Sequence, residues 1–182
     1  MRLGSLYALF MIVALTGCGG TPVGPIESSV NERTGESFAH VREPVYLVAG
    51  RPGLSTVGKD YLVMSPVTSN AGGQATTYLY FALGSSIDRV LTNAPPPDFD
   101  SVVLLIDDAM MTFELEPWSE FANAEPMDLD VRLRESYATR VTRSQLAKIA
   151  SADSVYAYVT DTSHRSPLYS YSRGSFAEWT QF

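Results

Sequence analysis

The stretch VVLLIDDAMMTFELE, residues 102–116, carries the strongest indication of the fold class. Two apolar runs flank Asp107-Asp108-Ala109, and aspartates favour a turn there because they tolerate the left-handed backbone and hydrogen-bond their own chain. The first run is apolar on both faces, which predicts a strand covered on both sides. The return run alternates, with Phe113 and Leu115 on one face and Glu114 and Glu116 on the other. These features together predict an antiparallel β-hairpin over residues 102–116.

Similar short apolar runs continue on both sides of this hairpin. Further strands are expected over residues 45–49, 59–64, 75–83, 129–141 with an interruption, 155–160 and 168–171. Clusters of turn-forming residues lie at 69–73, 93–97 and 163–167. Because parallel crossovers take a dozen residues or more, connections this short predict a mainly antiparallel sheet.

Two capping boxes indicate helices in the C-terminal third. In the first, Thr142 is followed three residues later by Gln145, and an apolar stripe comes next, formed by Leu146, Ile149 and Ala150. The second box is Ser175-Phe-Ala-Glu178, whose Phe176 and Trp179 are expected to lay their rings over the sheet and close the core. The predicted class is therefore α+β, a mainly antiparallel sheet with one or two short helices.

The composition fits one globular domain, expected over residues 43–182. Of the 182 residues 45% are hydrophobic and 18% are charged, which is a globular profile. A formal charge of −7 argues against a nucleic-acid partner, because binding phosphate requires a basic field.

The N-terminus has the features of a secretory signal. Arg2 precedes an apolar run over residues 6–15, and the small residues Thr16 and Gly17 lead to Cys18, the single cysteine of the chain. A helix that spans a bilayer needs roughly 20 residues, so this run is too short for a permanent span. A lone cysteine has no partner within the chain for a disulfide.

The four residues Leu15-Thr16-Gly17-Cys18 resemble the lipobox of bacterial lipoproteins. The resemblance covers residues 1–18 alone and implies a signal peptide over 1–17, cleaved between Gly17 and Cys18. It also implies a diacylglyceryl group on the Cys18 sulfur and further acylation, such as palmitate, on its amine. Two or three acyl chains make a stable membrane anchor, where one would be marginal. No aspartate follows Cys18, and by the same resemblance this favours the outer membrane over the inner membrane.

Two simpler interpretations of Cys18 stay open. It could be lost with a cleaved peptide, or it could be a free thiol in a cytosolic protein. If it is the lipidated N-terminus, residues 18–42, rich in Gly, Pro, Ser, Thr and Glu, are expected to form a flexible tether to the domain.

Motifs for metal, cofactor or nucleophilic chemistry do not emerge from the sequence. The two histidines, His40 and His164, lack zinc-site spacing, and no cofactor motif is present. The segment Asp161-Thr-Ser-His-Arg165 is interpreted as a surface turn. Asp128-Leu-Asp130 lacks the glycine and terminal glutamate of an EF-hand loop.

Carboxylates are the remaining catalytic candidates, because glycan-cleaving enzymes need only two acids at a suitable separation. Glu114 and Glu116 could form such a pair or bind a cation, although solvated charges on a strand face are the default interpretation. The other candidates are Asp98, Asp100, Asp107 and Asp108.

Three tyrosine pairs have the spacing that puts both rings on one face of a strand. They are Tyr78 and Tyr80, Tyr156 and Tyr158, and Tyr169 and Tyr171. The default interpretation is a half-buried sheet face with phenol tips in water. The functional alternative is a binding surface for a glycan or peptide.

The sequence thus predicts an exported, lipid-anchored protein of the bacterial cell envelope, at the periplasmic or outer face. Its expected role is a non-catalytic binding or assembly module with an envelope protein or glycan as partner. One alternative is an envelope hydrolase that uses paired carboxylates. Another is a subunit of an envelope complex, which needs a partner to cover a sheet edge.

Overall fold

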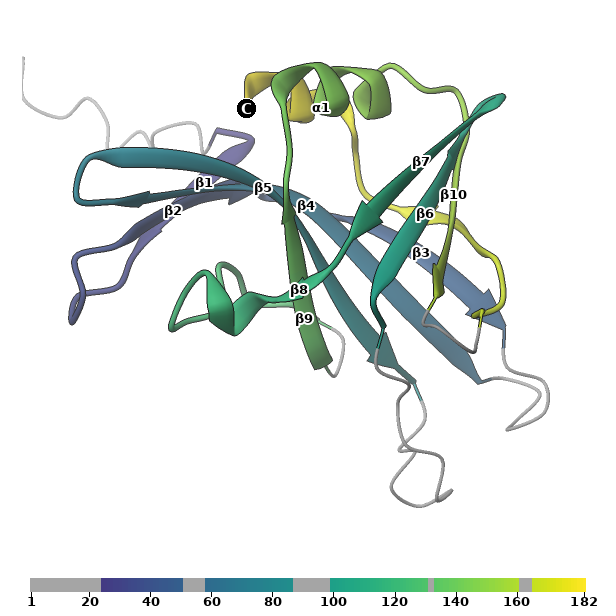
Figure 1. Ribbon diagram of the computed structural model, residues 1–182, viewed down its shortest axis with the longest axis horizontal. Helices are drawn as coiled ribbons and strands as arrows, with labels where there is room; N and C mark the ends of the chain where they lie inside the picture. The colour runs from purple at the N-terminus through teal and green to yellow at the C-terminus, as the bar shows by residue number, and fades with distance from the viewer. Residues whose placement is uncertain (1–23, 51–57, 87–98, 131–132, 161–164) are drawn as a thin grey trace, which may run out of the picture.

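A computed structural model of the chain describes residues 24–50, 58–86, 99–130, 133–160 and 165–182. These residues form one curled, barrel-like sheet, with the α-helix and the C-terminal 3₁₀ helix together at one end (Figure 1). The strands are β1 (Ile26–Val30), β2 (Ser37–Val41), β3 (Val45–Gly50), β4 (Lys59–Ala71), β5 (Gln74–Ser85), β6 (Ser101–Ile106), β7 (Ala109–Glu114), β8 (Glu116–Pro117), β9 (Leu133–Arg140), β10 (Val155–Thr160) and β11 (Tyr169–Arg173). The helical pieces are α1 (Arg143–Ala150) and the 3₁₀ turns η2 (Trp118–Glu120) and η3 (Ala177–Gln181).

The sheet runs in the order β7-β6-β10-β11-β3-β4-β5-β9-β8, and β1 and β2 extend it beside β4. Every pairing between the described strands is antiparallel. The chain passes from β7 directly into β8, which pairs with β9 and brings the two ends of the sheet together (Figure 1). The predicted fold class, α+β and mainly antiparallel β, is confirmed.

The hairpin predicted over residues 102–116 forms as β6 and β7. Its turn places Asp107 at a φ of 50°, the left-handed conformation that aspartate tolerates, and Asp107 Oδ1 accepts a hydrogen bond from Ser154 N at 2.9 Å. Phe113 is buried and Glu114 is exposed, so the alternation of the return strand holds.

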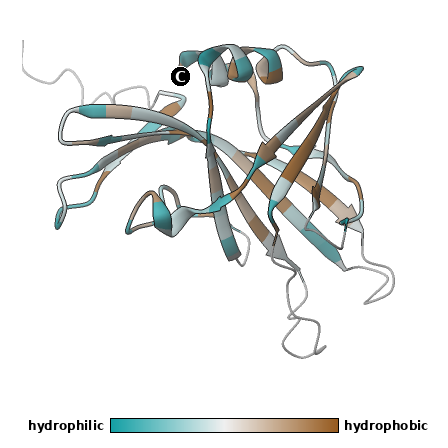
Figure 2. Cartoon of the chain, in the orientation of Figure 1, coloured by the Kyte–Doolittle hydropathy of each residue, from teal (hydrophilic) through white to brown (hydrophobic). Residues whose placement is uncertain are grey.

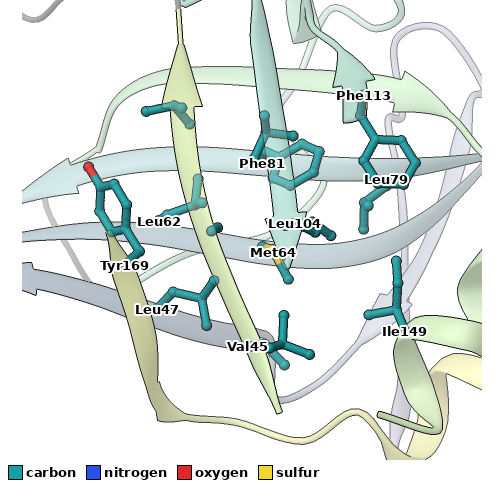
Figure 3. Packing of buried hydrophobic residues seen from close by; sticks show 14 of the residues in the cluster. Val45, Leu47, Leu62, Met64, Leu79, Phe81, Leu104, Phe113, Ile149 and Tyr169 are labelled. Carbon is teal, nitrogen blue, oxygen red and sulfur yellow. The ribbon is translucent and has the colours of Figure 1, made fainter. Parts of the chain in front are cut away.

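The larger core fills the concave side of the sheet (Figure 3). Alternate residues of β3, β4, β5, β6 and β10 point into it. The end of the barrel is closed by Leu146 and Ile149 of α1 and by Trp179 of η3, all three fully buried. The capping box of α1 forms as predicted, since Thr142 Oγ1 accepts from Gln145 N at 3.2 Å and Gln145 Oε1 accepts from Thr142 N at 2.8 Å. Figure 2 shows the apolar stretches gathered on the strands of the sheet.

Two local expectations need correction. Residues 26–30 and 37–41, expected within a flexible tether over 18–42, form β1 and β2, and β2 buries Phe38, His40 and Val41. The segment of the second capping box forms the 3₁₀ helix η3, but its N-cap is Phe176 with no side-chain cap, so the predicted box does not form; Trp179 closes the core as expected. The turn cluster at 93–97, and Gly17 and Cys18, lie outside the described residues.

Candidate functional site

A strap, residues 118–130, crosses the outer face of the sheet and packs on residues of β2, β3, β4, β5 and β9. Its anchor is Trp118, which is 2% exposed and packs edge-on against Tyr78 and Tyr80 of β5 at centroid distances of 5.9 and 5.4 Å. The indole N–H donates to the carbonyl oxygen of Ala124 at 2.8 Å, so burial leaves no polar atom of Trp118 unpaired. Phe38 of β2 and Met127 of the strap complete a second, smaller core there.

Two carboxylates fasten the strap to tyrosines of the sheet. Glu125 accepts a hydrogen bond from the Tyr80 hydroxyl at 2.6 Å and another from Ser136 Oγ at 2.6 Å. Asp130, at the end of the strap, accepts from the Tyr46 hydroxyl at 2.7 Å and from the guanidinium of Arg173. Hydrogen bonds to charged acceptors are stronger than neutral ones, so these contacts fix the path of the strap.

The surroundings of these groups raise the pKa values of the two tyrosines and lower the pKa of Asp130. Burial, together with the hydrogen bond to Asp130, raises the pKa of Tyr46 to about 12. Burial and the bond to Glu125 likewise raise the pKa of Tyr80. The hydrogen bonds from Arg173 and Tyr46 lower the pKa of the Asp130 carboxyl. At neutral pH both tyrosines therefore keep their protons and donate them in hydrogen bonds to the strap.

A hollow of about 640 Å³ lies between the strap and the β1–β2 hairpin. Its walls include Glu27 from β1, His40 from β2, Arg42 just after β2, and Glu125 and Asp128 from the strap. Arg42 Nε donates to Glu27 Oε1 at 2.7 Å, and both side chains are partly exposed. His40 is 6% exposed and stands opposite Glu27 in the register of β1 and β2.

Among the described residues, the outer side of β7, β6 and β10 has no covering segment like the strap. The register places Met110, Leu105 and Tyr156 side by side on β7, β6 and β10. Met110 is 71% and Tyr156 is 40% exposed. Val103 and Tyr158 form the neighbouring row, where the Arg165 guanidinium lies 3.5 Å from the centre of the Tyr158 ring. We call these five residues, Met110, Leu105, Tyr156, Val103 and Tyr158, the open face.

The six tyrosines predicted as a binding surface do not lie together. Tyr78 and Tyr80 are buried under the strap, and Tyr169 lies in the larger core. Tyr156 and Tyr158 belong to the open face. Tyr171, 50% exposed, donates a hydrogen bond to the Gly174 carbonyl at 2.6 Å and packs near Phe176.

The carboxylate candidates are also dispersed. Glu114 ends β7 and Glu116 opens β8, so the two acids stand opposite different strands, next to Ser101 and Ala138. Asp107 lies in the β6–β7 turn. Within the described ranges, no three His, Cys, Asp or Glu side chains gather closely enough to hold a metal ion. Asp98, Asp161 and His164 lie outside these ranges.

Sequence reasoning missed the strap and the hollow. The strap sequence WSEFANAEPMDLD has no period of helix or strand, and its one informative signal is a tryptophan in a polar segment. His40 and Arg42 were assigned to the tether. The short run Phe38-Ala39-His40-Val41, apolar but for the histidine, was the available hint of a strand.

Comparisons with known proteins give no relative: no protein-family model, curated protein or solved structure matches this chain. Among the described residues, no helix has both the length and the apolar character needed to cross a lipid bilayer.

Proposed function

We propose that this protein is a lipid-anchored component of the bacterial cell envelope that acts as a non-catalytic binding or assembly module. The anchor is supported by the lipobox-like residues 15–18 and their apolar leader. The binding role is supported by the open face, and that observation carries the proposal.

The open face contrasts with the other half of the same sheet surface. Where the strap lies, the chain buries its own outward aromatic residues, including Tyr78 and Tyr80, under Trp118. On the open face, Met110 on β7 and Tyr156 on β10 instead stand exposed on either side of the half-buried Leu105 of β6. Contiguous apolar side chains on a sheet surface are typical of interaction sites, because their burial against a partner is favourable.

The neighbouring strand edge favours a polypeptide as the partner. Of the strands in the described residues, β6 alone pairs with β7, so one edge of β7 offers unpaired backbone groups. Such an edge binds an extended peptide by strand addition, a mode that a glycan cannot reproduce. Edge and open face adjoin at Met110, so one partner segment could pair with β7 and cover the apolar row.

The polar groups favour binding over hydrolysis by paired carboxylates. Each oxygen of Glu125 already accepts a hydrogen bond, one from Tyr80 and one from Ser136, so this carboxylate is engaged in holding the strap. Glu114 and Glu116 belong to separate strands. Neither arrangement resembles the acid pairs of glycoside hydrolases, in which one carboxyl is kept protonated.

Site-specific cross-linking tests the proposed docking face. A photo-crosslinking amino acid replaces Met110 or Tyr156 in the full-length protein, and the control replaces Thr180, which is exposed on η3. We expect one discrete protein adduct from positions 110 and 156 after irradiation of intact cells, and none from position 180. The partner that is identified should also co-purify with the wild-type protein from detergent-solubilised membranes.

A charged substitution supplies the matching loss-of-binding test. Met110→Asp should reduce co-purification of that partner at least tenfold, because an ionised carboxylate would be buried at the contact. Thr180→Asp should leave it unchanged. Equal recovery with Met110→Asp and wild type, or an adduct with the mass of two copies of this chain, would contradict the proposal.

A further inference from the structure

The free edge of β7 presents the backbone groups of three residues. Leu115 N donates to the carbonyl oxygen of Asp100 at 2.8 Å, so residue 115 faces the strand of β6. Residues of an antiparallel pair alternate between hydrogen-bonded and non-hydrogen-bonded positions. In the register of β6 and β7, the odd-numbered residues of β7 therefore bond β6, and the N–H and C=O groups of Met110, Thr112 and Glu114 point away from it. No hydrogen bond within the described residues satisfies these groups.

The β6–β7 hairpin carries acidic charges alone. Residues 90–131, which include it, contain no lysine or arginine. Asp108 is exposed in the turn before β7, and Glu114 is exposed at its other end. Neither carboxylate forms an ion pair with a described residue. Arg165, the cation of the open face, stacks on Tyr158 of β10 and so does not neutralise them.

We propose that β7 adds an extended segment of a partner protein in which a short apolar run is flanked by lysine or arginine, an inference that rests on the docking proposed above. The backbone of the segment pairs with the three residues of the free edge. Its apolar side chains lie beside Met110 on one face and beside Met111 and Phe113, at the margin of the larger core, on the other. Its cations lie beside Asp108 and Glu114, because opposite charges on neighbouring strands stabilise the pairing.

The same charges argue against a second copy of this chain as the occupant. Two β7 strands side by side would bring their acidic ends together, and like charges across strands are destabilising. The net charge of −7 adds repulsion between copies. Met110 and Thr112, in the middle of the edge, lack the charge or proline with which proteins commonly block strand addition. The edge is thus open to a segment of opposite charge.

Random peptides of about 12 residues, longer than an average strand, are the probe for this edge. They are displayed on phage and selected on the full-length protein in detergent micelles. We expect the enriched peptides to carry a short apolar run flanked by lysine or arginine. The tightest of them is synthesised with a fluorophore, and its dissociation constant is measured by fluorescence anisotropy.

A proline on the edge separates backbone pairing from side-chain contact. Thr112 is exposed and its N–H points away from β6, so Thr112→Pro removes one free donor and leaves the β6–β7 ladder intact. It should weaken peptide binding about tenfold or more, since a hydrogen bond is lost and the ring intrudes on the partner strand. Thr112→Ala keeps the N–H and should bind within about twofold of wild type.

N-methylation of the peptide gives the same test without altering the protein. In an added strand, every second N–H faces β7 and the others face away. Methylation of successive residues should therefore abolish and spare binding in alternation. This scan decides the question even if Thr112→Pro does not fold.

Charge reversal tests the acidic end of the edge. Glu114→Lys should weaken peptide binding about fivefold or more, because it replaces attraction across the strands by repulsion. The matched control is Glu32→Lys, an exposed change in the turn between β1 and β2, away from β7 (Figure 1). It should change binding by less than about twofold, because salt screens a charge that lies away from the contact.

Three results would overturn the proposal. One is a selection that enriches no peptides, or peptides without an excess of lysine and arginine. The second is an N-methyl scan without alternation, which would exclude backbone pairing. The third is an equal loss of affinity in Glu114→Lys and Glu32→Lys.

The cross-linking experiment distinguishes these failures from failure of the docking proposal. A protein adduct at position 110 together with any of the three results would mean that the partner docks through side chains alone. Peptide binding as expected, with no adduct in cells, would contradict the docking proposal and leave the binding chemistry of β7 intact.

Discussion

Tyr46 and Asp130 are 84 residues apart in the chain and are joined by a single hydrogen bond of 2.7 Å. Arg173 completes the group, because its guanidinium binds Asp130 and lies 4.0 Å from the centre of the Tyr46 ring. β3, the strap and β11 are thus linked at one point. The Arg173–Asp130 pair is more than half exposed and contributes little alone, so the tyrosine hydroxyl is the stronger member.

Removing that hydroxyl should give a pH-dependent loss of stability. Tyr46→Phe keeps the ring and is expected to lower the free energy of unfolding by about 1 kcal/mol at pH 7. The folded pKa of Tyr46 is raised to about 12, so its contribution is present below pH 10 and is lost between about pH 10 and 12. The pKa of Asp130 is lowered, so its contribution is lost only as the pH falls below the ordinary carboxyl range.

Urea unfolding of wild type and Tyr46→Phe at pH 7 and near pH 12 measures this difference. Tyr171→Phe is the control, because the Tyr171 hydroxyl bonds a backbone carbonyl and no carboxylate. A stability difference between wild type and Tyr46→Phe that is as large at pH 12 as at pH 7 would refute the assigned role of the hydroxyl.

Gly174, the residue after Arg173, has an unusual backbone conformation. Its φ is +105°, and a Cβ there would lie 2.2 Å from the carbonyl oxygen of Pro44. Gly174→Ala should therefore destabilise the protein by about 3 kcal/mol, which thermal unfolding can measure. Gly50→Ala is the control, since a Cβ at Gly50 meets nothing within 4 Å. Similar unfolding temperatures for the two variants would contradict a steric cause.

At the scale of elements, the sequence predicts those whose side chains repeat with a clear period. The β6–β7 hairpin and α1 are correct because Asp107 and the Thr142 capping box mark their limits. β1 was missed because it is held by backbone pairing with β2, and four of its five side chains are exposed. The strap sequence has the periodicity of neither a helix nor a strand. Which tyrosines the strap covers could therefore not be predicted from the sequence.

Trp118 should be the residue that keeps the whole strap, residues 118–130, packed on the sheet. Trp118→Ala removes the ring that packs between Phe38, Tyr78 and Tyr80, and by analogy with other buried tryptophans costs about 3–5 kcal/mol. Much of this loss should be local, since the strap packs on the smaller core alone. We expect hydrogen exchange to accelerate across residues 118–130 while β6 and β10 keep their protection.

Glu120→Ala, an exposed change on the same segment, is the control for this exchange experiment. Protection that falls equally in the strap and in β10 would show that the two cores unfold together.

At the scale of the whole molecule, β1 shortens the tether between the proposed lipid anchor and the folded domain. The sheet begins at Ile26, so seven residues separate it from Cys18 where a tether extending to residue 42 was expected. Eight steps of extended chain span at most roughly 29 Å. If Cys18 carries lipid, the start of the sheet stays within that distance of the bilayer, and the hollow, which Ile26 lines, stays near the membrane.

If Cys18 carries the proposed lipid, its replacement should release an intact domain. Cys18→Ser should move the protein from the membrane fraction to the soluble fraction and abolish incorporation of labelled palmitate. In the proposed anchor, two or three acyl chains would supply the anchoring energy. Gly19→Ser is the matched control and should stay in the membrane. Circular dichroism of the released protein should match wild type, because residues 24–182 are unchanged. A Cys18→Ser protein that still sediments with membranes, while correctly folded, would place the attachment in the domain itself, with the open face the first surface to examine.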